Sequence, residues 1–272
     1  MTKDRKRQQG GDNDRLDFHE RCSTPRRALF FDMFNWKILR LLIVAMPLLA
    51  QQYRAPRTAN GQPDLQGIWQ AETAASDDIL PHAARPGVPG GIGIVVGGEI
   101  PYTSQAAAQQ QKNFQDRAAA DPVNKCFLPG VPRVNYMPFP FQIFQTAKDV
   151  AILYEYVHAY RLIPLDGSKH PEDIDFWMGD SRGHWEGETL VVDVADNNGD
   201  TWFDGSGNFH SEALHIIERY TRTSPDTISY EATIEDPKTF TKPWKISFPL
   251  YRHQDKNLEL LEYDCYAFEP SK

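Results

Sequence analysis

From residue 141 onward, hydrophobic and polar residues alternate along the chain, which is the pattern of strands with one buried face. In 227–236 every second residue from Ile228 to Ile234 is hydrophobic, and 243–252 repeats the pattern. Clusters of Gly, Pro, Asn and Asp separate these segments, as expected for turns. The segments predicted as strands are 142–148, 150–158, 159–164, 174–179, 184–195, 211–222, 227–236, 243–252 and 257–267.

Short strands at this spacing, with no helices between them, predict a mainly β fold. We expect an antiparallel meander that closes into a calycin-like barrel. The chain then divides into three regions, which are a leader with a signal peptide (1–50), an irregular N-terminal arm (51–140) and the antiparallel β-barrel (141–272).

One helix is predicted within the N-terminal arm, at 104–120, where Ala and Gln are abundant. Thr103 or Ser104 is a suitable N-cap for it. Pro122 is expected to end it, because proline does not continue a helix.

Three predicted strands carry charged residues among hydrophobic ones. In 210–220, Glu218 and Arg219 fall on opposite faces, so alternation alone leaves open which face points inward. The segments 185–194 and 258–266 likewise mix acidic and hydrophobic residues. Ionised groups are rarely buried without partners, so these strands indicate polar groups inside the barrel or in a cleft.

His210 and Glu212 are the first candidate catalytic pair. In a regular strand they would project from one face about 7 Å apart, so Glu212 could orient His210 as a general base. The alternative is a structural hydrogen bond at the end of a strand. A zinc site of His210, Glu212 and His215 is disfavoured because His215 falls on the opposite face, and no metal site is predicted.

Asp180 and Arg182 are the second candidate catalytic pair, flanked by Gly179 and Gly183. Asp180 could act as an acid and Arg182 as an anion clamp or electrostatic stabiliser, whereas the alternative is a salt-bridged hairpin turn. The predicted ligand-binding residues are His158, Tyr154, Tyr156, Trp177, Trp185 and Arg219, and the alternative for the aromatic residues is a place in the core.

The segment 33–50 has the composition of a secretory signal peptide. Lys37 and Arg40 precede an apolar run that ends at Ala50 and is too short to span a bilayer. Met33 is therefore the preferred start of translation, and a periplasmic or secreted location is expected. A long leader with a twin-arginine-like sequence at Arg26 and Arg27, and a membrane anchor, are the alternatives.

The charge of the chain argues against polyanionic partners. Residues 1–50 hold 10 of the 29 basic and 6 of the 37 acidic residues, so 51–272 has a net charge of 19 − 31 = −12. A surface this acidic repels nucleic acid and anionic membranes. We therefore expect a small-molecule ligand, no nucleic-acid partner and no stable membrane insertion of the mature chain.

Two cysteines follow the predicted signal peptide. Cys22 precedes the cleavage point, so Cys126 and Cys265 remain in the mature chain. Cysteines in an oxidising compartment usually pair. We predict a disulfide between them, closing a loop of about 140 residues.

Several motifs carry a family resemblance. They are Pro63-Asp-Leu-Gln-Gly-Ile-Trp69, Asp180-Ser-Arg-Gly-His-Trp-Glu-Gly-Glu-Thr-Leu-Val-Val-Asp193 and His210-Ser-Glu-Ala-Leu-His215. Through them the chain resembles a large group of secreted bacterial proteins of unassigned function, over most of 51–272. The resemblance implies export and a shared fold but no catalytic residues. The predicted meander is also similar in architecture to calycin (lipocalin-like) barrels, although fold does not fix function.

These features together predict an exported β-barrel protein that binds a small, partly apolar ligand in its cavity. A cofactor-free secreted lyase, isomerase or hydrolase that uses His210 and Glu212 is one alternative. A structural envelope protein is the other. No cofactor is predicted, and the oligomeric state is left open.

Overall fold

The computed structural model describes residues 53–265, which belong to one compact unit. The predicted signal peptide, 33–50, lies outside the described residues. The strands are β1 (Gly67–Ala71), β2 (Phe141–Gln145), β3 (Asp149–Tyr154), β4 (Tyr160–Pro164), β5 (Asp180–Glu186), β6 (Thr189–Ala195), β7 (His215–Ser224), β8 (Thr227–Glu235) and β9 (Trp244–Arg252).

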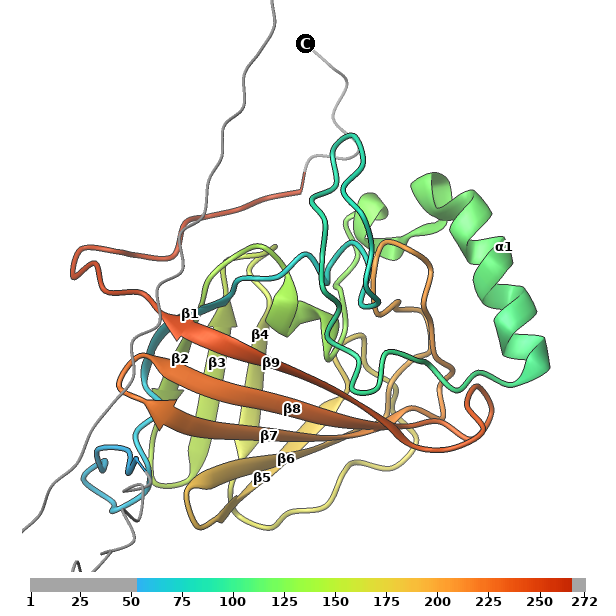
Figure 1. Ribbon diagram of the computed structural model, residues 1–272. Helices are drawn as coiled ribbons and strands as arrows, with labels where there is room; N and C mark the ends of the chain where they lie inside the picture. Colours follow the sequence, from blue (N-terminus) through green and yellow to red (C-terminus); the bar gives the residue numbers. More distant parts are fainter. Residues whose placement is uncertain (1–52, 266–272) are drawn as a thin grey trace, which may run out of the picture. The chain divides into compact units, whose positions relative to one another are not determined.

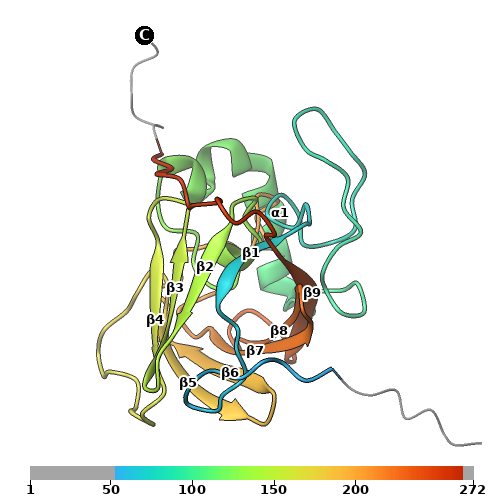
Figure 2. The ribbon, with the colours of Figure 1, turned by 90° about the vertical axis from the view of Figure 1, so that its left-hand side faces the viewer.

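The nine strands form one antiparallel sheet in the order β4-β3-β2-β1-β9-β8-β7-β6-β5. Figures 1 and 2 show how this sheet curves round, with β1 lying between β2 and β9. Trp69 of β1 is opposite Phe141 of β2 and Arg252 of β9. The sheet is therefore a meander nearly closed into a barrel, which confirms the predicted fold class, and β4 and β5 remain as its two edges.

The inner faces of the long strands follow the predicted alternation. Every second residue from Ile228 to Ile234 and from Trp244 to Leu250 is buried. In β7 the buried face carries Glu218, so Arg219 points outward. The question that alternation left open is thus decided in favour of a buried carboxylate.

Strand β1 is missing from the sequence prediction, which placed the whole sheet after residue 141. Trp69 is fully buried, and its indole Nε1 donates to the Leu65 carbonyl oxygen at 2.9 Å. Only five residues form this strand, so its pattern is short. Its strand conformation depends on pairing with β2 and β9, which are distant in sequence.

Three other predicted strands differ from the structure. The segment 184–195 belongs to two strands, because a turn at Gly187, with φ +60°, joins β5 to β6. The segment 174–179 is part of the β4–β5 loop and ends at Gly179, with φ +63°. Residues 257–265 form no strand, only an isolated bridge at Tyr263, and 266–267 lie outside the described residues.

Helix α1 (Ser104–Ala120) has the predicted bounds. The Thr103 hydroxyl caps it by accepting a hydrogen bond from the backbone N–H of Ala106. Ala106 is its buried residue, so the helix lies along the outside of the barrel (Figure 1). Two short 3-10 helices follow it, η1 (Pro122–Lys125) and η2 (Arg133–Tyr136).

The predicted disulfide between Cys126 and Cys265 is present. It holds the segment that follows β9 against the barrel, where Tyr263 stacks on Tyr156 with ring centroids 5.5 Å apart. No helix among residues 53–265 has the length and apolar character needed to cross a membrane.

Candidate functional site

The seam between β4 and β5 is the one place where neighbouring strands of the barrel are not hydrogen-bonded to each other. Side chains close it instead. A Cβ atom at Gly183 of β5 would lie 2.7 Å from Ile163 Cγ2 and 2.8 Å from Leu165 Cδ2. Glycine is therefore required at this position for β4 and β5 to approach so closely.

A groove of about 610 Å³ follows this seam. Three segments line it, namely Leu128, the β4 region 158–162 and the segment 175–181. Its wall is mainly apolar and aromatic, with Tyr160, Leu162 and Phe176 exposed and Trp177 half-buried. A second groove, of about 490 Å³, lies on the other side of β4.

Trp177 and His158 are positioned by contacts near the disulfide. The Trp177 ring stacks on Phe127 with centroids 4.7 Å apart and 7° between the planes. His158 Nε2 lies 2.9 Å from Asp264 Oδ1. Because Phe127 and Asp264 are neighbours of the two bonded cysteines, the disulfide fixes both sides of the groove.

Arg161 connects the groove to the barrel interior, since it lines the groove yet is only 3% exposed. Its guanidinium donates to Ser181 Oγ across the seam, at 2.9 Å, and to both carboxylate oxygens of Glu218, at 2.5 and 3.1 Å. Burial opposes the positive charge, but Glu218 holds the pKa of Arg161 above its ordinary value.

Glu218 is saturated by hydrogen bonds inside the barrel. Its Oε1 accepts from Tyr230 Oη at 2.8 Å, from Tyr220 Oη at 3.0 Å and from Asn135 Nδ2 at 2.9 Å. Tyr154 completes the network by donating to Asn135 Oδ1 at 2.8 Å. Burial raises the pKa values of all three tyrosines, which keeps them neutral donors. The interior at this level is thus occupied by side chains, and the groove lies at the seam.

The two members of the predicted acid–base pair His210 and Glu212 are not in contact. His210 precedes β7, so the strand alternation that placed the two residues on one face does not apply. His210 Nδ1 donates to the Ser211 carbonyl oxygen, and Nε2 accepts from the Thr201 hydroxyl at 2.7 Å. Glu212 instead pairs with Lys238 at the surface.

His210 is shielded from solvent, with 2% of its surface exposed. Burial lowers its pKa, so the neutral ring is favoured. This environment corresponds to the structural alternative for His210.

The predicted pair of Asp180 and Arg182 is formed. Arg182 Nε donates to Asp180 Oδ2 at 2.6 Å and Nη2 to Oδ1 at 3.0 Å. Nη1 donates to Ser168 Oγ at 2.7 Å, so the guanidinium is held from two sides. The hairpin turn itself lies further along, at Gly187.

The predicted ligand-binding residues divide into two groups. His158 and Trp177 line the seam groove together with Asp180, and Tyr154 lines the second groove. The others lie elsewhere: Tyr156 is buried against Tyr263, Trp185 packs against the core, and Arg219 pairs with Glu186 on the outer surface.

The sequence analysis missed Tyr160, Arg161 and Leu162 as groove residues. The sequence does carry a signal for two of them, because Tyr160 and Leu162 are large hydrophobic residues on the exposed face of β4, whose other face is buried. When the outer face of a strand is apolar, that face is usually either covered by another part of the protein or forms a binding site.

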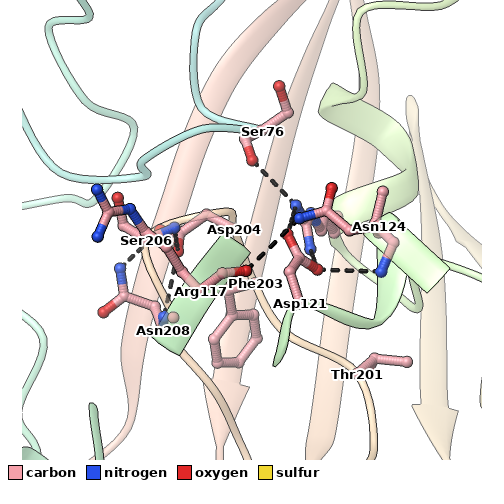
Figure 3. A network of polar contacts seen from close by, with 12 residues as sticks. Ser76, Arg117, Asp121, Asn124, Thr201, Phe203, Asp204, Ser206 and Asn208 are labelled. Atoms are coloured by element: carbon pink, nitrogen blue, oxygen red, sulfur yellow. Dashed lines mark hydrogen bonds and ion pairs between the residues drawn. The ribbon is translucent and has the colours of Figure 1, made fainter. Parts of the chain in front are cut away.

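A separate polar network surrounds Asp204 and Asp121 (Figure 3). Asp204 accepts from the backbone N–H groups of Ile79 and Ser206 and from Asn208. Burial raises the pKa of Asp204 to about 7, although these donors oppose the shift. These hydrogen bonds connect the loop at Ile79 with the loop at 204–208, and none of the residues named here lines the seam groove.

Comparisons of the chain with protein-family models, with curated proteins and with solved structures find no match. The resemblance to secreted bacterial proteins therefore stays a prediction.

Proposed function

We propose that this protein binds a small, partly apolar molecule in the groove along the β4–β5 seam. The observation that carries this proposal is the lining of the groove, which brings Trp177 of the β4–β5 loop beside His158 and Tyr160 of the β4 region. Its volume of about 610 Å³ is in the usual range for small-molecule sites. Its mixture of apolar walls and a few polar groups is also typical of such sites.

Tyr160 supports the proposal because it is an aromatic side chain with 72% of its surface exposed. Leu162, two residues further along the same face, is also exposed. Contiguous exposed apolar surface often marks a binding site. A ligand seated beside Trp177 would remove this surface from water, and the hydrophobic effect would favour binding.

We further propose that the protein works outside the cytosol. The disulfide between Cys126 and Cys265 supports this, since such bonds persist in oxidising compartments. The signal-peptide composition of 33–50 supports it independently.

The first test is native mass spectrometry of the full-chain gene product purified from an exporting host. A ligand that remains bound would appear as extra mass. The second is a fluorescence titration with the apolar probe 1-anilinonaphthalene-8-sulfonate. We expect saturable binding, weakened about fivefold in Tyr160→Ala, because an aromatic contact contributes about 1 kcal/mol.

Tyr251→Ala is the matched control, since Tyr251 is an exposed aromatic residue on β9 outside the groove. Its probe affinity should equal that of the wild type. Equal weakening in the two variants, or absence of saturable binding, would refute the seam groove as the binding site.

A further inference from the structure

Three possible metal ligands converge at the corner where β5 begins and β6 ends. They are His170 from the β4–β5 loop, Asp180 at the start of β5 and Asp196 directly after β6. One nitrogen or oxygen atom of each lies within 4.8 Å of the others, and His170 Nδ1 is 2.7 Å from Asp180 Oδ2. The sheet register explains the convergence, because Asp180 pairs with Ala195, the residue before Asp196.

The Asp196 carboxylate lacks a partner for one of its oxygens. Oδ2 is buried and has no hydrogen-bond partner among the residues that the structure describes. The same holds for Oδ1 of the adjacent Asn197, whose side chain lies beside Gly179, the residue before Asp180. Burying such oxygens without a partner is unfavourable. A cation at this corner would supply the missing interaction for Asp196.

His170 is oriented as metal-bound histidines usually are. Its second ring nitrogen, Nε2, lies 3.4 Å from Asp193 Oδ1, and that oxygen is also 2.7 Å from His215 Nε2. Ligating histidines almost always direct their other nitrogen to a carboxylate, a carbonyl or water. Asp180 is oriented in the same way by the guanidinium of Arg182.

The charges of the cluster leave room for a divalent cation. Asp180, Asp193 and Asp196 carry three negative charges as carboxylates, whereas Arg182 supplies one positive charge. With neutral imidazoles, two negative charges remain in a half-buried site. The donor set is one imidazole nitrogen and carboxylate oxygens, without thiolates, which suits zinc and related first-row divalent ions.

We propose that His170, Asp180 and Asp196 bind one divalent transition-metal ion, with Zn²⁺ as the best match. The alternative is that His170 only contacts Asp180 and Asp193 as a structural polar cluster and that the three residues bind no metal. Asp180 also lines the seam groove, but the test measures zinc binding alone, so its outcome does not depend on whether the groove binds a ligand.

The test is isothermal titration of the EDTA-treated full-chain protein, without a histidine tag, with ZnCl₂ at pH 7.5. We expect one ion per chain and a rise in thermal stability on binding. His170→Gln and Asp196→Asn should each weaken the affinity at least tenfold. Substitution with Co²⁺ should give visible absorption bands in the wild type that are lost in both variants.

His184→Gln is the matched control, because His184 forms an exposed histidine–carboxylate pair with Glu186 on the same strand as Asp180. Its zinc affinity should be unchanged. The proposal is overturned if the wild type binds no zinc, or if His170→Gln and Asp196→Asn keep wild-type affinity. If a variant fails to fold, the Co²⁺ spectrum of the wild type is the remaining test, and absence of visible absorption bands there would also overturn the proposal.

Discussion

Some buried polar side chains of this protein have specific partners for their charge or hydrogen bonds, whereas Asp196 Oδ2 and Asn197 Oδ1 have no hydrogen-bond partner among the described residues. Glu218 is completely buried, yet it receives bonds from Arg161, Tyr220 and Tyr230. Removing one partner of such a pair leaves an uncompensated charge, which is strongly unfavourable. His210 is satisfied in the same way by Thr201 and the Ser211 carbonyl.

We expect His210→Ala to lower the free energy of unfolding by about 2–4 kcal/mol, because it removes two buried hydrogen bonds and leaves a cavity. Burial lowers the folded-state pKa of His210, so below its ordinary value the unfolded chain binds the extra proton. The stability contributed by neutral His210 is thus present at pH 8 and declines toward pH 5.

Urea unfolding of the wild type and the variant at both pH values measures this difference. His184→Ala, at an exposed site, should change stability by no more than about 0.5 kcal/mol. Unchanged stability in His210→Ala would instead favour the functional role predicted from the sequence.

The strands β4 and β5 are two edges held together by side chains rather than by a ladder of hydrogen bonds. The bond from Arg161 to Ser181 and the close approach at Gly183 span the seam. Edge strands normally need protection against pairing with other chains. Here each edge protects the other, and the outward side chains of β4 are left to form the groove.

Gly183→Ala should lower the free energy of unfolding by about 1–3 kcal/mol, because its Cβ would collide with Ile163 and Leu165 and force the strands apart. Gly205→Ala is the comparison, since its Cβ would meet no atom closer than 3.5 Å. Thermal unfolding by circular dichroism measures both. Equal effects would show that the seam is not tightly packed at Gly183.

The barrel and its covering segments act together through the disulfide, which joins residues 139 positions apart. It tethers the segment after β9 to the loop that follows η1. Asp264 of that segment contacts His158, and Phe127, next to Cys126, stacks on Trp177. The disulfide therefore stabilises the barrel and also holds two residues that line the groove.

We expect Cys126→Ser combined with Cys265→Ser to lower the free energy of unfolding by about 3–5 kcal/mol, since the closed loop is long. Denaturant unfolding of the oxidised wild type and the double variant tests this. Addition of a reductant should bring the wild type to the stability of the variant and leave the variant unchanged. A difference below about 1 kcal/mol would contradict a stabilising role.

The sequence by itself determined the mainly β class, the bounds of α1, the inward faces of β8 and β9, and the cysteine pair. These features are local or compositional: strand alternation, a capping residue, and two cysteines in a chain with a predicted export signal. They can be predicted because neighbouring residues decide them.

Only the tertiary structure decided which groups meet. Strand β1 exists because β2 and β9 flank it, and Glu218 is buried because Arg161 reaches it from β4. The groove along the seam and the cluster at His170 likewise assemble residues from separate segments. Strand alternation gives the face of a side chain, but its partners depend on how distant strands pair, and no local pattern contains that information.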